Sequence, residues 1–321
     1  NAVRPWFAAL LSLLILSTPV WAANSRQVLW VEGSIKAKQT SDRKSPSREL
    51  QPTDALAGKL RVLIPAGSAL WFLDGQRELI GLHGPGSWDI FEDSPIRGEG
   101  TLTRIAVHEI DLDKGPIVPW IELAPLDGAK RRAVPSSPSE TAITTRRPVL
   151  RWRNEPGVLR IALTLLERKP TGEERLVETW QGLTGSHHEV RRPLKPGHDY
   201  AWRLEADGDI SDPAAAKSEA NTWFHVLSDA SIQSARRADA AISSLQLDHP
   251  KASKALNVLR ALTWEKYGLA AEAQKAWDDI TAEAGDVEAL RLYRARLNLR
   301  ALARPRLKAP SPAPPSETKR P

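Results

Sequence analysis

The stretch LKPGHDYAWRL, residues 194–204, is the part of the chain from which the fold can be worked out. Pro196 and Gly197 favour a tight turn, because proline presets one backbone angle and glycine accepts conformations that other residues avoid. Tyr200, Trp202 and Leu204 then alternate with smaller or charged residues. Alternation with a period of two predicts a β-strand that turns one face towards a core.

Further runs rich in aliphatic and aromatic residues lie on both sides of this stretch and predict additional strands. They span residues 148–152, 158–166, 175–180 and 221–227. Several short strands separated by turn signals are typical of an antiparallel sandwich.

The turn and strand at 194–204 resemble the tyrosine corner of fibronectin type III-like sandwiches. The resemblance implies that the Tyr200 hydroxyl bonds back to nearby backbone, and that Trp152 is buried on an early strand. It assigns residues 148–228 to such a sandwich and indicates no particular function.

The N-terminal part of the chain also has the pattern of a β domain. Predicted strands span residues 27–35, 60–64, 69–73, 78–82 and 87–91, with a long polar loop at 36–49. The dipeptide Asp74-Gly75 between two apolar runs predicts a hairpin. Several strands are apolar at both odd and even positions, so both faces should be covered, as in a rolled sheet or small sandwich.

Three segments of this region resemble the β domain of FecR-type periplasmic proteins. They are Ala57–Val62, Ser68–Phe72 and Leu82–Trp88, which match a Gly-led strand, an alternating strand and an apolar-x-Gly-x-Gly turn. The resemblance implies a FecR-like β domain over residues 23–126.

Residues 229–304 change to the helical period of apolar residues, at spacings of three and four. Residues 252–264 and 270–280, separated by Tyr267-Gly268, resemble a tetratricopeptide repeat, with Ala261, Ala273 and Trp277 at its small and aromatic positions. Because one repeat cannot bury its own face, helices at 234–247 and 287–302 are expected as its neighbours.

Two segments lack any periodicity. Residues 127–147 are basic and rich in Pro, Ser and Thr, which predicts a linker. Residues 305–321 form a Pro/Ser/Lys tail with little to bury, which we expect to be disordered. The fold class is therefore multidomain: an all-β N-terminal half, built from a rolled sheet and an immunoglobulin- or fibronectin-like sandwich, followed by a short helical hairpin-repeat module.

The first residues have the pattern of an export signal over residues 1–22. Arg4 precedes the apolar run Trp6–Leu16, and cleavage between Ala22 and Ala23 places Val20 and Ala22 at the positions that a signal peptidase reads. This pattern predicts a periplasmic or secreted protein. The alternative is an uncleaved segment that anchors the protein in the membrane and leaves it facing the periplasm.

Composition excludes several classes of site. The chain has 321 residues and no cysteine, which rules out disulfides, thiol nucleophiles and cysteine-based metal sites. Its 45 basic and 39 acidic side chains give a net charge of +6, too dilute over this length to indicate nucleic acid.

Few residues have the pattern of a metal-binding or catalytic site. His187, His188 and His198 could be metal ligands, but adjacent residues of a strand point to opposite faces. Asp111 and Asp113 could form a carboxylate pair, but no partner base or nucleophile accompanies them. No nucleophile-elbow, zinc-protease or phosphate-loop motif is present. We therefore expect no enzymatic activity, no cofactor and no metal.

Two features could recognise a partner. Arg296, Arg300 and Arg304 recur every four residues and would form one basic ridge of a helix, either solvated or facing an anionic partner. We expect most of the tryptophans in predicted strands to be core residues. The alternative is that two of them form an exposed pair on which a sugar ring stacks. The tryptophans in predicted strands are Trp30, Trp71, Trp88, Trp120, Trp152, Trp180, Trp202 and Trp223.

The sequence thus predicts an exported, non-enzymatic envelope protein that binds a protein or a cell-wall polymer, and not nucleic acid. The alternatives are a glycan-binding module that uses exposed tryptophans and, less favoured, an uncharacterised hydrolase.

Overall fold

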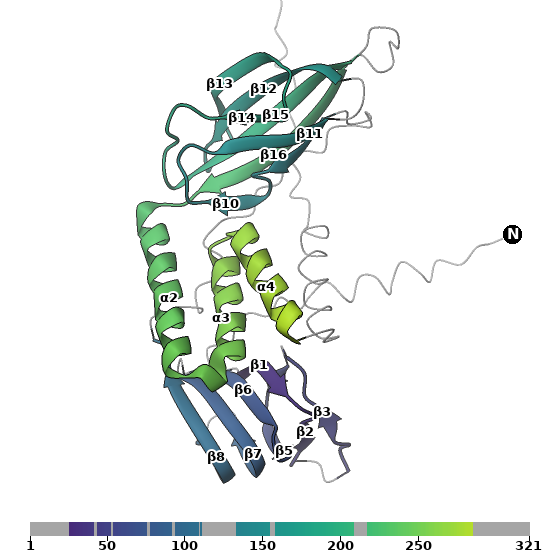
Figure 1. Ribbon diagram of the computed structural model, residues 1–321, viewed down its shortest axis with the longest axis vertical. Helices are drawn as coiled ribbons and strands as arrows, with labels where there is room; N and C mark the ends of the chain where they lie inside the picture. The colour runs from purple at the N-terminus through teal and green to yellow at the C-terminus, as the bar shows by residue number, and fades with distance from the viewer. Residues whose placement is uncertain are drawn as a thin grey trace, which may run out of the picture. The chain divides into compact units, whose positions relative to one another are not determined.

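The computed structural model describes residues 26–41, 44–52, 54–75, 78–91, 94–108, 110, 133–154, 158–208 and 217–284. These residues form mainly β-strands, with helices towards the C-terminal end (Figure 1). They divide into two compact units. The first unit contains the N-terminal strands together with residues 235–266 and most of the last helix, and the second contains the strands from residue 133 onwards.

The strands of the first unit form one sheet. They are β1 (Arg26–Glu32), β2 (Lys36–Gln39), β3 (Arg48–Glu49), β4 (Ala55–Leu56), β5 (Lys59–Ile64), β6 (Ala69–Asp74), β7 (Glu78–Phe91) and β8 (Arg97–Ala106). The order is β3-β2-β5-β7-β6-β1-β4, with β8 paired to the other edge of β7. The first half of β7 pairs with β6 and the second half with β5, so the sheet curls around β7. The hairpin predicted at Asp74-Gly75 joins β6 to β7 and is confirmed.

Both faces of the curled sheet are buried along β6 and the first half of β7, as the unbroken apolar runs predicted. Leu70 and Phe72 of β6 lie in a core that the sheet encloses with its own strands. Trp71 points to the opposite face, where it pairs with Trp30 of β1 and is only 2% exposed. Gly81 faces Trp71 from β7, and a Cβ atom there would lie 2.5 Å from the indole ring. The second face is therefore a tightly packed layer of its own.

Helix α3 (Ser253–Lys266) lies against β1 on this second face. The ammonium of Lys254 is 5.4 Å from the centre of the Trp30 ring, within the range of a cation–π contact. The helices were expected as a separate module over residues 229–304, but in the described part of the chain they group with the N-terminal sheet. The physical reason is that the sheet has a second apolar face, which the helices cover.

Three details of the first unit differ from the sequence prediction. The loop predicted at 36–49 contains β2 and β3, because Lys36 and Lys38 point outwards while Ala37 between them is buried. Gly84-Pro85-Gly86 does not separate two strands but lies within β7. A Cβ atom on Gly84 would lie 1.9 Å from the Pro65 carbonyl oxygen, so only glycine allows this close approach. The polar strand β8 was not predicted.

The second unit is a sandwich of two sheets. Its strands are β9 (Ala133–Ser137), β10 (Thr141–Ile143), β11 (Val149–Asn154), β12 (Val158–Arg168), β13 (Glu174–Leu183), β14 (His187–Glu189), β15 (His198–Gly208) and β16 (Lys217–Val226). The larger sheet has the order β10-β16-β15-β12-β13, and the smaller one has the order β14-β11-β9 (Figure 1). The predicted all-β sandwich is confirmed.

The core of the sandwich confirms the detail predicted for residues 194–204. Tyr200, Trp202 and Leu204 are all buried, together with Trp152 of the opposite sheet. The Tyr200 hydroxyl accepts a hydrogen bond of 2.9 Å from the backbone N–H of Lys195. The turn is thus held to the strand that follows it.

The linker predicted over residues 127–147 is wrong for residues 133–143, which contribute β9 and β10 to the sandwich. The segment has few apolar residues, but Ala133 and Ala142 are buried, and the Pro138 carbonyl accepts a hydrogen bond from Trp202 Nε1. Composition missed these strands because each buries only a small residue and is held mainly by hydrogen bonds. Residues 127–132 lie outside the described part of the chain.

The helices follow the sandwich in the sequence. Helix α2 (Asp229–Asp248) leads through the short 3₁₀ helix η3 (Pro250–Ala252) into α3, and α4 (Ala270–Ala284) follows Gly268, which has a φ of 70°. The predicted helices at 234–247, 252–264 and 270–280 are confirmed. None of the helices in the described residues has the length and apolar character that crossing a membrane requires.

Candidate binding surface

Several residues singled out from the sequence lie outside the described part of the chain. They are Ala22 and Ala23 of the export signal, Asp111 and Asp113, Trp120, and the basic ridge of Arg296, Arg300 and Arg304. Their predicted roles therefore stay predictions, as does the disordered tail at 305–321.

The three candidate metal-binding histidines do not come together. His187 and His188 alternate on β14, with His187 exposed and His188 turned inwards, where its ring lies 4.5 Å from that of Trp180. Burial, followed by the charge of Arg191, lowers the pKa of His188. His198 instead forms a 2.7 Å ion pair with Glu167 of β12. Each histidine thus has a separate local environment.

Most tryptophans are core residues, as predicted. Of those in the described residues, seven are buried: Trp30, Trp71, Trp88, Trp152, Trp202, Trp223 and Trp277. Trp180 and Trp264 are partly buried. The described residues therefore present no pair of exposed indole rings to a sugar.

Two carboxylate–imidazole pairs lie on β15 and its neighbours. Glu167 contacts both His198 and Lys195, and His225 Nδ1 lies 2.6 Å from Asp199 Oδ1. Burial raises the pKa of Glu167, but the hydrogen bond and charge of Lys195, with those of His198, outweigh it and leave the pKa below its usual value. Neither His198 nor His225 is hydrogen-bonded to a hydroxyl group of another described residue. These pairs join neighbouring strands and do not activate a nucleophile among the residues described.

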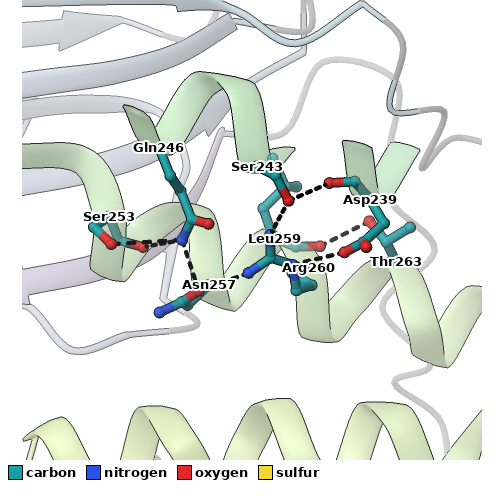
Figure 2. A network of polar contacts seen from close by, with 8 residues as sticks. All are labelled: Asp239, Ser243, Gln246, Ser253, Asn257, Leu259, Arg260 and Thr263. Atoms are coloured by element: carbon teal, nitrogen blue, oxygen red, sulfur yellow. Dashed lines mark hydrogen bonds and ion pairs between the residues drawn. The ribbon is translucent and has the colours of Figure 1, made fainter. Parts of the chain in front are cut away.

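A polar seam joins α2 to α3 (Figure 2). Arg260 lies at its centre and donates hydrogen bonds of 2.8 Å to Asp239 and to Ser243 across the helix pair. Gln246 donates to Asn257 at 2.7 Å. These side chains use their hydrogen-bonding groups on one another. The seam therefore holds the two helices together and offers little free hydrogen-bonding capacity to a ligand.

The strongest candidate surface is on the outer side of the smaller sheet of the sandwich. Five arginines gather there, which we call the arginine face. They are Arg147, Arg151, Arg153, Arg191 and Arg192, and all five are exposed. Arg151 and Arg153 alternate on β11 with Trp152, which is buried in the core, and exposed His187 pairs with Arg151 from β14.

No hydrogen bond or ion pair joins these five arginine side chains to another residue that the structure describes. Some cations of the same unit are paired: Lys195 with Glu167, Arg203 with Glu174, and Arg146 with Asp229. Glu189 of β14 is exposed and lies opposite Val149, so its carboxylate is on the same face, but no ion pair joins it to any of the five arginines. Within the described chain the face is therefore an array of free guanidinium groups, each able to donate to an oxyanion in a bidentate manner.

The arginine face was not among the surfaces predicted from the sequence, although the sequence contains a signal for part of it. Arg151 and Arg153 flank Trp152 at the end of the strand predicted over residues 148–152, and alternation places such residues on the solvent side. Arg191 and Arg192 belong to a segment about 40 residues away in the sequence, which only strand pairing brings close.

Comparisons with known proteins identify no family. No protein-family model matches the chain, and no curated protein matches it. A comparison with solved structures finds, among others, the fibronectin domains FN1–FN3 of chicken CNTN1, with 10% sequence identity and a TM-score of 0.20. That match covers 61% of this chain and 56% of the CNTN1 chain, so the chain spans little more than half of that structure's length.

Proposed function

We propose that this protein is an exported, non-enzymatic component of the cell envelope that binds an anionic partner through the arginine face of its sandwich. The observation that carries the proposal is the gathering of five exposed arginines around one described carboxylate, that of Glu189, with no ion pair between any of them and a described acidic residue. Uncompensated like charges repel one another, and an external anion relieves that repulsion.

The resemblances drawn from the sequence support the same function. A FecR-like β domain favours a periplasmic protein and a tetratricopeptide-like helical pair favours protein binding, whereas the fibronectin type III-like sandwich indicates no particular function by itself. The pattern of residues 1–22 supports export, and an uncleaved segment there would tether the protein to the membrane. The partner would then be an envelope protein or a cell-wall polymer.

Binding through stacked tryptophans receives less support, because the described tryptophans are buried or partly buried. A hydrolase would require a nucleophile or a paired acid and base. The carboxylates considered for that role, Asp111 and Asp113, lie outside the described residues.

Co-sedimentation of the full chain with isolated cell walls tests the proposal. We expect the wild-type chain to sediment at low ionic strength and to be released by salt, because exposed charges are screened within about 10 Å at 0.1 M salt. The double variant Arg151→Glu/Arg153→Glu should stay in solution.

The matched control is Arg160→Glu/Arg175→Glu, which makes the same change of charge on the other sheet of the same sandwich. It should sediment like the wild type. If both double variants bind equally well, or if the wild type does not sediment at all, the arginine face is not the binding surface and the proposal fails.

A further inference from the structure

The arginine face is a row and not a round patch. Residues 147, 149, 151 and 153 occupy every second position, and Val149, Arg151 and Arg153 belong to β11. Side chains at every second position of a strand lie on one face of the sheet, spaced about 6.6 Å apart. From Arg147 to Arg153 the row therefore extends over about 20 Å.

Residues 187–194 run beside this row. They place Arg191 and Arg192 near one end of it and His187 beside Arg151. The Val190 N–H donates to the Pro148 carbonyl at 3.0 Å, and the Leu194 N–H donates to the Arg146 carbonyl at 2.8 Å. These bonds hold residues 190–194 beside 146–148, which places Arg191 and Arg192 near Arg147. His187 lies opposite Arg151 and Glu189 opposite Val149, so the row is two strands wide along most of its length and includes one carboxylate.

The surface lacks the features of a membrane contact. Interfacial segments combine cations with large apolar side chains that enter the acyl region. The exposed large hydrophobic residues of the described chain are Leu63, Leu176 and Leu247, and none of them is on the smaller sheet. The charges alone must therefore supply the affinity of this face.

We propose that the arginine face binds a linear phosphate polymer, which lies along β11 with separate phosphates of the same chain against Arg147, Arg151 and Arg153. This inference rests on the proposed function and names the partner of that same surface. A phosphate chain carries a charge on every unit and rotates freely between units, so neighbouring charges can turn towards one side. The guanidinium fork matches phosphate oxygens, and its delocalised charge is weakly hydrated, which favours such contacts.

Inorganic polyphosphate is the probe, and isothermal titration calorimetry of the full chain measures binding. Orthophosphate, tripolyphosphate and a longer chain are compared at equal phosphate concentration. We expect no detectable binding of orthophosphate, and an affinity that rises with chain length until the ligand spans the row. The logarithm of the binding constant should fall linearly with the logarithm of salt concentration, since each phosphate that an arginine neutralises releases counterions.

The variant Arg151→Glu/Arg153→Glu should reduce the magnitude of that salt slope by about two, one for each phosphate that the variant can no longer bind. The control variant Arg160→Glu/Arg175→Glu should leave both the slope and the affinity unchanged. Circular dichroism spectra that match the wild type would show that both variants are folded.

Three outcomes would overturn the inference. Polygalacturonate that binds as tightly as polyphosphate would indicate a carboxylated polymer, and binding confined to vesicles rich in anionic lipid would indicate a headgroup surface. Orthophosphate that binds as well as the chains would reduce the site to a point contact. In each case, loss of cell-wall co-sedimentation in Arg151→Glu/Arg153→Glu would still support the proposed function. Failure of the phosphate-polymer inference can therefore be distinguished from failure of the proposed function.

Discussion

Single side chains hold the turn at the centre of the sandwich. The hydroxyl of Tyr200 accepts a hydrogen bond from the Lys195 N–H, while its ring is stacked on Phe224 with 5.6 Å between the ring centres. Tyr200 is 1% exposed, so its hydroxyl group as well as its ring is shielded from water. The hydroxyl and the ring therefore make separate contributions to stability.

Tyr200→Phe should lower the free energy of unfolding of the sandwich by about 1–3 kcal/mol, because it keeps the ring and leaves the Lys195 N–H unpaired. Urea denaturation followed by tryptophan fluorescence measures the change. Lys195→Ala is the control, since it retains the backbone N–H and removes only the partly buried ion pair with Glu167. An unchanged midpoint for Tyr200→Phe would mean that this hydrogen bond adds nothing to stability.

Glu167 makes the stability of the sandwich depend on pH. Burial acts to raise the pKa of its carboxyl, but Lys195 and His198 outweigh burial and hold that pKa below the usual value in the folded state. A carboxyl with a lowered pKa adds stability that is fully present above its unfolded value, near 4.5, and is lost as the pH falls through its folded value.

We therefore expect wild-type stability to fall more steeply than that of Glu167→Gln when the pH is lowered from about 6 to about 3. Denaturation midpoints measured across this range give the comparison. Glu189→Gln, which changes an exposed carboxylate of β14, should retain the wild-type slope. Parallel curves for wild type and Glu167→Gln would contradict the assignment.

Among the secondary-structure elements, α2 and α3 are joined by polar contacts as well as by apolar ones. Arg260 is 22% exposed and bonds to both Asp239 and Ser243 (Figure 2). The Trp/Leu-Gly signature of a tetratricopeptide repeat is absent from α3, because Arg260 stands before Ala261. Here the long side chain crosses to α2 and takes part in holding the pair together.

A double-mutant cycle with Asp239→Asn and Arg260→Gln should give a coupling energy of about 0.5–1 kcal/mol, typical of a partly exposed pair in direct contact. Thermal unfolding followed by circular dichroism measures it. Lys275→Gln combined with Asp239→Asn is the control, and it should give no coupling because no hydrogen bond or ion pair of the described residues joins those two side chains. If the effects of Asp239→Asn and Arg260→Gln were additive, the contact between these two side chains would not contribute to stability.

At the scale of the whole molecule, the helices complete the N-terminal sheet. Trp30 and Trp71 occupy the face opposite the core that the sheet encloses, and α3 lies against β1. Aromatic side chains bury about 150–250 Å² each, which is a large contribution for a domain whose net stability is about 5–15 kcal/mol.

A fragment that ends at Ile117 should therefore fail to unfold cooperatively and should bind the dye ANS through its exposed apolar face. A fragment of residues 118–234 retains the entire core of the sandwich and should unfold cooperatively. Differential scanning calorimetry distinguishes the two. Cooperative unfolding of the first fragment alone would restore the expectation of an independent N-terminal domain over residues 23–126.

The sequence alone determined which segments become strands or helices and where the chain turns. The strands around Tyr200, the hairpin at Asp74-Gly75 and the helices on either side of Gly268 depend on periodicity and turn residues, which act over a few positions. Strands β8, β9 and β10 were not predicted, because they bury little apolar surface. Hydrogen bonds to partners far away in the sequence hold them in place.

Only the tertiary structure decided which surfaces meet. Apolar runs in the N-terminal strands indicated that both faces are covered, but not that α3 lies against β1. The arginine face likewise joins residues 147–153 with residues 191 and 192, which become neighbours when segment 190–194 bonds to 146–148. The physical reason is the same in both cases: local sequence encodes the period of each element, whereas pairing between elements depends on complementary surfaces far apart in the chain.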